Sequence, residues 1–232
     1  MTELSIVIVF DNKTLKSDLV PSWGFACVVR FAGKTILFDT GADGAILLDN
    51  MKKLNINPED IEVVALSHAH WDHANGLGSF LELNSNVTVY LPQSFPQSYK
   101  ESVMHSGAVA KEIHRAEELL SGMFTTGEMS GIIEEQALAF KTSRGTVVIT
   151  GCAHPGIVEI VQAAKKITAD SIYLALGGFH FPKPEVVSSF RKMGVQKAAP
   201  CHCSGDEAID FFREAYGDDY IGIGVGKEIT IG

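Results

Sequence analysis

The sequence predicts a layered α/β fold. Short apolar runs bounded by Gly, Asn, Asp or Pro recur along the 232 residues, which is typical of buried strands. Stretches with a helical spacing of apolar residues lie between several of these runs. The strands gather in two stretches, one in each half of the chain, as expected when helices cover packed sheets.

The first half begins with three predicted strands, at residues 4–10, 26–31 and 35–38. The last two form a hairpin at Ala32-Gly33-Lys34. A helix is predicted over residues 46–54, because the pattern stops before Asn57-Pro58. Further strands are predicted at 63–66 and 87–91.

The second half contains predicted strands at 137–141, 146–150, 172–176 and 197–199. Between them, residues 155–167 have a helical period, with Pro155 in the first turn. A last helix is predicted over residues 206–216.

The segment 93–134 has scattered Met, Gly and Ser and one plausible helix, at 109–120. A mobile cover over a site and an ordinary irregular insertion both fit this pattern, and we favour the insertion. His105 and His114 lie in this segment and are interpreted as surface residues.

The composition favours a globular protein with a substantial core, since 46% of the residues are hydrophobic and 20% are charged. The formal net charge is -9 and no run of Lys or Arg exceeds a pair, which argues against a nucleic-acid partner. A small anionic substrate remains compatible, because a bound metal supplies positive charge locally.

Cysteine usage and the N-terminus bear on location. The four cysteines do not form the dense framework of a small secreted scaffold. The apolar run at residues 6–10 is too short to cross a bilayer and reads as a buried strand. We therefore expect a reducing cytoplasm and no membrane partner; the oligomeric state is not set by the sequence.

The chemistry is concentrated in one segment that carries His68, His70, Asp72 and His73, four potential ligands within six residues. In an extended chain, residues two apart point to the same face, so His68 and His70 can converge on one point. A turn into a following helix would direct Asp72 and His73 to a neighbouring point. Imidazole and carboxylate suit zinc, iron or manganese.

Three more histidines, His154, His180 and His202, each follow a predicted strand on a turn that contains glycine or cysteine. The carboxyl ends of strands are where an α/β scaffold places a site. One zinc shell holds about four ligands, and the chain offers more than that. The surplus favours two metals over one.

The full pattern resembles the metallo-β-lactamase superfamily. His68 to His73 match its H-x-H-x-D-H motif, and Phe38-Asp39-Thr40-Gly41 looks like its D-T-G turn. Glu135 to Leu138, Gly151 to Gly156, Gly177 to His180 and His202 to Gly205 are similar to the branch that includes the dihydropterin-methyl-ribofuranosyl-aminobenzene-phosphate synthase of methanopterin biosynthesis.

The resemblance implies an αβ/βα four-layer sandwich, with two packed mixed sheets and outer helices, in a single domain over residues 1–232. It implies that Asp39 orients metal ligands. Carried over position by position, it puts one metal among His68, His70 and His154, and another among Asp72, His73 and His202.

One position departs from the superfamily. Most members bridge the two metals with an aspartate after the strand that here ends near residue 176, and this chain has Gly177-Gly178-Phe179-His180. His180 either substitutes as a ligand or acts as an acid that faces the substrate.

Several neighbouring residues have two readings. Cys152, Cys201 and Cys203 flank predicted ligands, and thiolates bind zinc, but we favour the simpler role of small buried residues. Trp71 and Phe179 fit either a pocket for a flat ring or simple packing. For Lys183 and Arg144 we favour surface charge over contact with an anionic substrate.

The predicted function is a metal-dependent hydrolase. A metal lowers the pKa of bound water towards neutrality, and the resulting hydroxide would attack an ester or phosphoester of a small molecule. Asp72 would bind metal and orient the nucleophile, and His180 would contact the leaving group. We expect one or two divalent ions per chain, zinc first, with iron and manganese open.

Three other functions remain. A transferase that releases pyrophosphate is the first, because the branch contains a synthase. A non-catalytic metal-binding domain is the second. Diiron redox chemistry is disfavoured, since such relatives usually carry Glu at the position of His70 and need a flavin domain.

Overall fold

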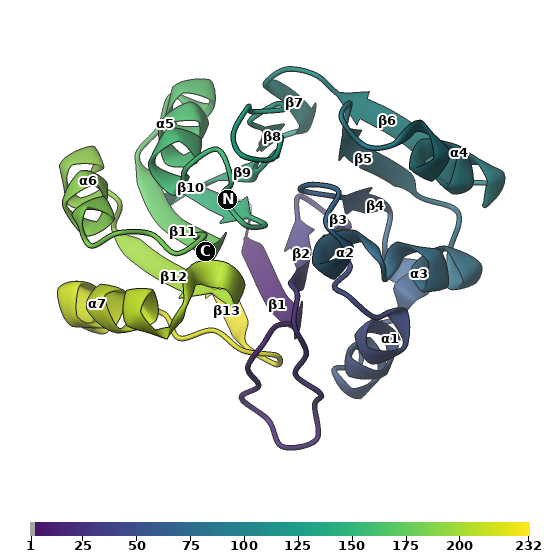
Figure 1. The fold of residues 1–232 in the computed structure, drawn as a ribbon, viewed down its shortest axis with the longest axis horizontal. Helices are drawn as coiled ribbons and strands as arrows, with labels where there is room; N and C mark the ends of the chain where they lie inside the picture. Colours follow the sequence, from purple (N-terminus) through teal and green to yellow (C-terminus); the bar gives the residue numbers. More distant parts are fainter. Residues whose placement is uncertain (1–2) are drawn as a thin grey trace.

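Two mixed β-sheets pack against each other, and helices cover their outer faces, in a computed structural model that describes residues 3–232 (Figure 1). The first sheet has seven strands, in the spatial order β13 (Glu228–Ile231), β1 (Leu4–Phe10), β2 (Ala26–Phe31), β3 (Lys34–Phe38), β4 (Val63–Ala65), β5 (Thr88–Pro92) and β6 (Val109–Ile113). The second has six, in the order β12 (Lys197–Cys201), β11 (Ile172–Gly178), β10 (Gly145–Thr150), β9 (Leu138–Thr142), β8 (Met123–Thr125) and β7 (Glu117–Leu120).

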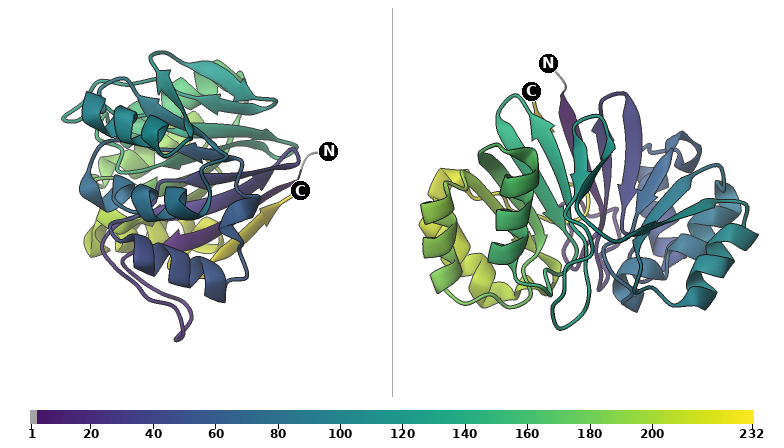
Figure 2. Two further views of the ribbon diagram at one scale, coloured as in Figure 1. Left: turned by 90° about the vertical axis from the view of Figure 1, so that its right-hand side faces the viewer. Right: turned by 90° about the horizontal axis from the view of Figure 1, so that it is seen from above.

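Helices form the two outer layers. The first sheet carries α1 (Gly44–Lys53), α2 (Trp71–Ala74), α3 (Leu77–Leu83) and α4 (Gln97–His105), and the second carries α5 (Ile157–Thr168), α6 (Glu185–Met193) and α7 (Asp206–Tyr216). Three short 3-10 helices are at Pro58–Asp60, His202–Ser204 and Gly217–Asp219. The view from above shows helices, sheet, sheet and helices in sequence (Figure 2), so the predicted αβ/βα sandwich is confirmed.

The core is divided by the sheets because successive side chains of a strand point to opposite faces. In β1, Ile6 and Ile8 face the space between the sheets, where Phe38 and Phe140 also lie. Val7 and the other outward residues of the first sheet pack instead under α1, α3 and α4. A third cluster lies between the second sheet and α5, α6 and α7. Both faces of both sheets are therefore buried.

Most predicted elements are confirmed. Three match the observed bounds fully, namely residues 4–10, 26–31 and 206–216. The other predicted strands, and the helices at 46–54 and 155–167, shift by one or two residues at their ends. α4, α6, β8 and β13 were not predicted.

The helix predicted over 109–120 is wrong. Residues 109–113 form β6, which pairs in parallel with β5, and residues 117–120 form β7, which pairs with β8 in the other sheet. The chain crosses from one sheet to the other between them. Pairing satisfies the edge of β5 and outweighs a weak local helical pattern.

The parallel strands of the two sheets set the position of the site. β3, β4 and β5 run parallel in the first sheet, as β10, β11 and β12 do in the second. The segments that follow β4, β10, β11 and β12 meet at one edge of the sandwich and carry the predicted ligands. Among residues 3–232, no helix is long and apolar enough to cross a membrane.

Candidate metal centre

The first group of donors is formed by His68, His70 and His154, whose ligand atoms all lie within 4.8 Å of one another. His68 Nε2 lies 3.1 Å from His70 Nδ1. His68 and His70 follow β4, whereas His154 follows β10, so the group joins the two sheets. This is the first trio that the resemblance implies.

The second group is formed by Asp72, His73 and His202, again with all ligand atoms within 4.8 Å. His73 Nε2 lies 3.1 Å from His202 Nε2, and Asp72 Oδ2 lies 3.3 Å from the same His202 nitrogen. The rings of His68 and His73 have centroids 4.3 Å apart, so the two groups are adjacent.

Asp39 holds one histidine of each group. Its Oδ1 accepts the Ser67 backbone N–H at 2.7 Å, and its Oδ2 accepts the Ser67 hydroxyl and His73 Nδ1–H, each at 2.7 Å. The Ser67 hydroxyl oxygen in turn lies 2.8 Å from His68 Nδ1. Burial raises the pKa of the Asp39 carboxyl, against the hydrogen bonds from Ser67. The predicted orienting role of Asp39 is thus compatible with its contacts.

Glu135 supports the other side of the first group. It is fully buried before β9 and accepts the backbone N–H groups of Cys152, Ala153 and His154 at 2.9 to 3.0 Å. It also accepts the Thr150 hydroxyl at 3.1 Å and His154 Nδ1–H at 2.8 Å. Burial opposes ionisation, but the hydrogen bonds from His154 and from the neighbouring backbone N–H groups lower the pKa of Glu135. The sequence did not predict a role for Glu135, although an acid just before an apolar strand is a signal for one.

Asn12 orients His202, and sequence reasoning missed it. Its Oδ1 lies 3.0 Å from His202 Nδ1 and accepts the Gly24 backbone N–H at 3.1 Å. Its Nδ2 donates to the His202 carbonyl at 3.1 Å. An asparagine after a strand gives no signal by itself, because its partner is 190 residues away.

The donor chemistry fits a divalent metal. The Nδ1–H of each of four histidines has a hydrogen-bond acceptor. Each Nε2 atom is therefore unprotonated, and its lone pair is directed into one of the two donor groups. The pairs are His68 with Ser67, His73 with Asp39, His154 with Glu135, and His202 with Asn12. Burial, together with the neighbouring His202, lowers the pKa of His73 to about 3. Burial also lowers the pKa of His68, so both imidazoles are neutral and can coordinate.

His180 faces the first group from the end of β11. Its ring centroid lies 4.6 Å from that of His154, and its backbone has a φ of 48°. Among the described residues, its buried Nδ1 has no hydrogen-bond partner. Contact with the Cys203 side chain raises the pKa of His180, against the effect of burial.

Left-handed backbone is concentrated at this edge. The backbone φ angle lies between 48° and 60° at four residues in addition to His180, namely Asp39, Ala153, Phe181 and His202. Such conformations cost of order 1–3 kcal/mol each in non-glycine residues and persist where surrounding contacts fix them. The turns that carry the donors are therefore held by the rest of the structure.

The cysteines are buried, as predicted. Two of them nevertheless lie among the donors, since Cys152 Sγ is 3.2 Å from His73 Nε2 and Cys203 Sγ is within 4.8 Å of both Cys152 and His180. The hydrogen bond between the two thiols and burial raise the pKa of Cys152. Cys201 lies beneath His202, facing the core between the sheets.

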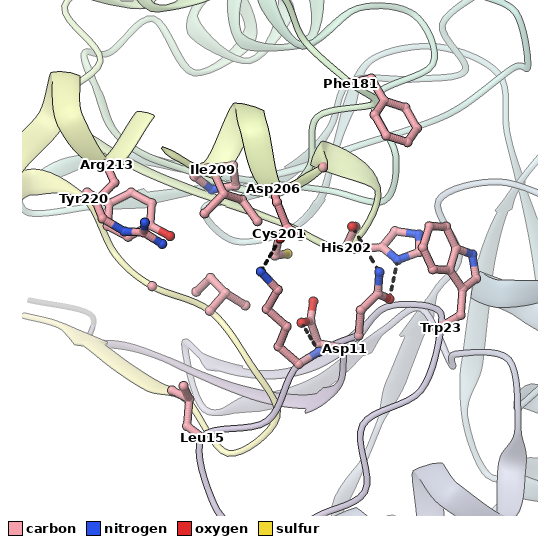
Figure 3. Close-up of a pocket in the computed structure, with 16 residues that line it drawn as sticks. Asp11, Leu15, Trp23, Phe181, Cys201, His202, Asp206, Ile209, Arg213 and Tyr220 are labelled. Atoms are coloured by element: carbon pink, nitrogen blue, oxygen red, sulfur yellow. Dashed lines mark hydrogen bonds and ion pairs between the residues drawn. The ribbon is translucent and has the colours of Figure 1, made fainter. Parts of the chain in front are cut away.

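A pocket of about 540 Å³ opens beside His202 (Figure 3). Trp23 and Phe181 lie at the His202 end of the pocket, and the Trp23 and His202 rings have centroids 5.1 Å apart. Lys13 and Arg213 also line it, together with Asp11 and Asp206. Sequence reasoning did not identify this pocket, because its walls come from both ends of the chain.

The other residues that the sequence analysis considered are either buried in the core or exposed on the surface. Phe179 is buried against aromatic residues of α6 and α7 and does not line a pocket among those described, whereas Trp71 is 56% exposed. Lys183 and His105 are exposed, as is His114. Arg144 is also exposed, with its guanidinium over the Tyr173 ring.

The chain belongs to the metallo-beta-lactamase superfamily, whose family profile matches residues 24–161. That span contains Asp39, the motif from His68 to His73, and His154. His180 and His202 lie beyond it.

Individual relatives agree with this membership. The chain is 30% identical to the 7,8-dihydropterin-6-methyl-4-(beta-D-ribofuranosyl)-aminobenzene-5'-phosphate synthase of Methanocaldococcus jannaschii, over 84% of each sequence. Among solved structures, Tm1679, a metal-dependent hydrolase of the beta-lactamase superfamily, is 27% identical, with a TM-score of 0.81 and coverage of 97% of this chain and 98% of that one. A diphosphatase of the PhnP family shares the fold at 16% identity, with a TM-score of 0.66 and coverage of 100% and 98%.

Proposed function

We propose that this chain is a metal-dependent hydrolase that binds one or two divalent ions, zinc first, and cleaves an ester or phosphoester of a small molecule. One observation carries the proposal: two adjacent groups of donors, each with histidine nitrogens oriented by buried hydrogen bonds. Iron and manganese accept the same donors and remain alternatives to zinc.

The ligands divide as the geometry suggests. His68, His70 and His154 would hold one ion, and Asp72, His73 and His202 the other. A bound divalent metal would supply positive charge and a water of lowered pKa. Asp39, Glu135 and Asn12 would keep the imidazoles in the tautomer that coordinates.

Asp72 is the proposed residue for the nucleophile. Burial opposes its ionisation, but the hydrogen bond from His202 lowers the pKa of Asp72. An ionised carboxylate at this position can orient an attacking water and accept its proton.

His180 is the proposed contact for the leaving group. Its ring faces His154, and contact with the Cys203 side chain raises the pKa of His180, which favours the protonated imidazole. A protonated imidazole there can donate to a departing oxygen.

The pocket beside His202 supports a small-molecule substrate. Its volume suits a drug-sized molecule, and its aromatic walls at Trp23 and Phe181 suit a flat group. Lys13 and Arg213 line the pocket, but Lys13 pairs with Asp206 at 2.6 Å and Arg213 pairs with Asp210. Asp11 and Asp206 line the pocket as well, so its lining carries charges of both signs.

A transferase is the second candidate. The observation that favours it is the 30% identity with a synthase over 84% of both chains. The name of that synthase gives its product, which contains a pterin and an aminobenzene phosphate. A substrate with such flat groups would suit the aromatic walls at Trp23 and Phe181.

Metal analysis and turnover together test the proposal. Elemental mass spectrometry of protein purified without chelator should give one or two metals per chain, and His68→Ala and His202→Ala should each lose metal from one group. Asp72→Asn, loaded with metal, should reduce turnover of a phosphoester panel by roughly 100-fold or more without unfolding. Absence of metal after reconstitution would contradict the proposed metal centre. Unchanged turnover in Asp72→Asn would contradict the proposed role of Asp72.

The same panel separates the two activities. Hydrolysis of phosphoesters without an acceptor supports the hydrolase. Product that forms only when a pterin pyrophosphate and an aminobenzene acceptor are both present supports the transferase.

A further inference from the structure

The two donor groups share one more side chain. Cys152 Sγ lies within 4.8 Å of a ring nitrogen of His68 and of His73, which belong to different groups. Its distance to His73 Nε2 is 3.2 Å, and the residue is 4% exposed. A sulfur at the boundary between the groups is placed where a ligand common to both would lie.

The backbone around Cys152 is fixed from two sides. The Cys152 N–H donates to Glu135 Oε1 at 2.9 Å, so the residue shares its anchor with His154. The preceding Gly151 packs closely against the first sheet: a Cβ there would lie 2.7 Å from the Ser67 Cβ and 3.1 Å from Asp39 Oδ2. Only glycine allows this approach, which brings the thiol to the imidazoles of the opposite sheet.

Most members of the superfamily carry a bridging aspartate after the strand that corresponds to β11, and this chain has no room for a side chain there. Gly178 lies at the end of β11, and a Cβ on it would come within 2.6 Å of Cys203 Sγ and 2.5 Å of the Gly151 carbonyl oxygen. No side chain therefore fits there, and the sulfur of Cys203 fills the space behind Cys152.

We infer that Cys152 is a thiolate ligand of the metal centre and occupies the boundary between the two ions that a carboxylate would otherwise occupy. The inference rests on the proposed metal site. The thiol loses its proton to solvent as the sulfur–metal bond forms, because the thiolate is the coordinating form. Soft sulfur donors favour zinc over the harder cations.

Cys203 supplies a matched control. It is as buried as Cys152, at 5%, and its Sγ lies beside the Cys152 carbonyl at 3.7 Å. Among the described residues, its donor group contains Cys152 and His180 but neither His68 nor His73. Cys203 therefore lies behind Cys152, on the side away from His68 and His73.

Cobalt substitution tests the inference without measuring activity. The wild-type protein, Cys152→Ser and Cys203→Ser are loaded with cobalt(II), and their absorption spectra are recorded. We expect a thiolate-to-cobalt charge-transfer band in the near ultraviolet for wild type and Cys203→Ser. Cys152→Ser should lose this band, keep visible bands from nitrogen and oxygen ligands, and bind metal roughly tenfold more weakly or worse.

Two results would overturn the inference. Wild-type protein with visible cobalt bands but no charge-transfer band would exclude a thiolate while leaving the metal site intact. Loss of the band in Cys203→Ser but not in Cys152→Ser would show that the thiolate ligand is Cys203 and not Cys152. If no cobalt binds at all, the proposed function fails as well, so the two failures are distinguishable.

X-ray absorption of the zinc-loaded wild type keeps the test decisive if Cys152→Ser does not fold. One sulfur at about 2.3 Å is expected. A shell of nitrogen and oxygen alone would contradict it.

Discussion

Asp11 is buried directly after β1, beside the pocket that His202 borders. One carboxylate oxygen accepts the Lys13 backbone N–H at 2.9 Å, and the other has no hydrogen-bond partner among residues 3–232. Burial raises the pKa of Asp11 to about 6, from an ordinary value of 3.8. An ionised carboxylate here therefore costs stability that a neutral group does not.

The pH dependence of stability should reflect this residue. The folded state holds the Asp11 proton more tightly than the unfolded chain does. The stability of wild type is therefore unaffected by this residue below about pH 4, and stability is lost as the pH rises through about 6. Asp11→Asn removes the titration and keeps the acceptor for Lys13. Its free energy of unfolding should exceed that of wild type by about 3 kcal/mol above pH 7 and match it near pH 4.

Urea unfolding of both proteins at several pH values, under the same metal conditions, measures the difference. The exposed Asp60→Asn should leave the profile unchanged. A gap between wild type and Asp11→Asn that stays constant from pH 4 to pH 8 would refute the assignment.

At the scale of elements, α6 depends on one buried side chain. Phe190 is fully buried, with ring centroids 5.8 Å from Phe179 and 5.6 Å from Phe212. Phe179 directly precedes His180, so this aromatic cluster also supports the turn at the end of β11.

Phe190→Ala should lower the free energy of unfolding by about 3–4 kcal/mol, because it removes buried apolar area and leaves a cavity. Ser188→Ala, at an exposed position of the same helix, should change it by less than about 0.5 kcal/mol. Chemical denaturation of wild type, Phe190→Ala and Ser188→Ala measures these differences. Equal stabilities would mean that α6 does not depend on Phe190.

At the scale of the whole molecule, the candidate metal centre joins the two halves of the sandwich. His68, His70 and His73 follow a strand of the first sheet, and His154 and His202 follow strands of the second. An ion bound by both sets would stabilise the folded state by mass action, since the unfolded chain does not preserve the site.

Metal removal should therefore lower the Tm of the entire chain. At free metal about 100-fold above Kd the stabilisation is about 2.7 kcal/mol, which corresponds to roughly 5–10 °C for a chain of this size. Calorimetry with chelator and after metal addition measures the shift. His68→Ala, which disrupts one of the two donor groups, should reduce the shift, and the exposed His105→Ala should retain it in full. A wild-type Tm that does not change with metal would contradict the prediction.

The sequence alone determined the elements with strong local patterns. β1, β2 and α7 were predicted with correct bounds because their apolar periodicity matches one type of secondary structure. The spacing of His68, His70, Asp72 and His73 likewise concentrates donors in one turn, whatever surrounds it. Their proximity to His154 and His202 followed only from the resemblance and from their places after strands.

Tertiary structure decided the rest, because it depends on partners distant in sequence. Residues 109–120 became two strands through pairing with β5 and β8, which no local pattern encodes. Glu135 and Asn12 gained their contacts with His154 and His202 only when the ends of β1, β9, β10 and β12 met. Cys152 is a small apolar residue in the sequence, and the approach of Gly151 to Ser67 places its sulfur against the imidazoles of the other sheet.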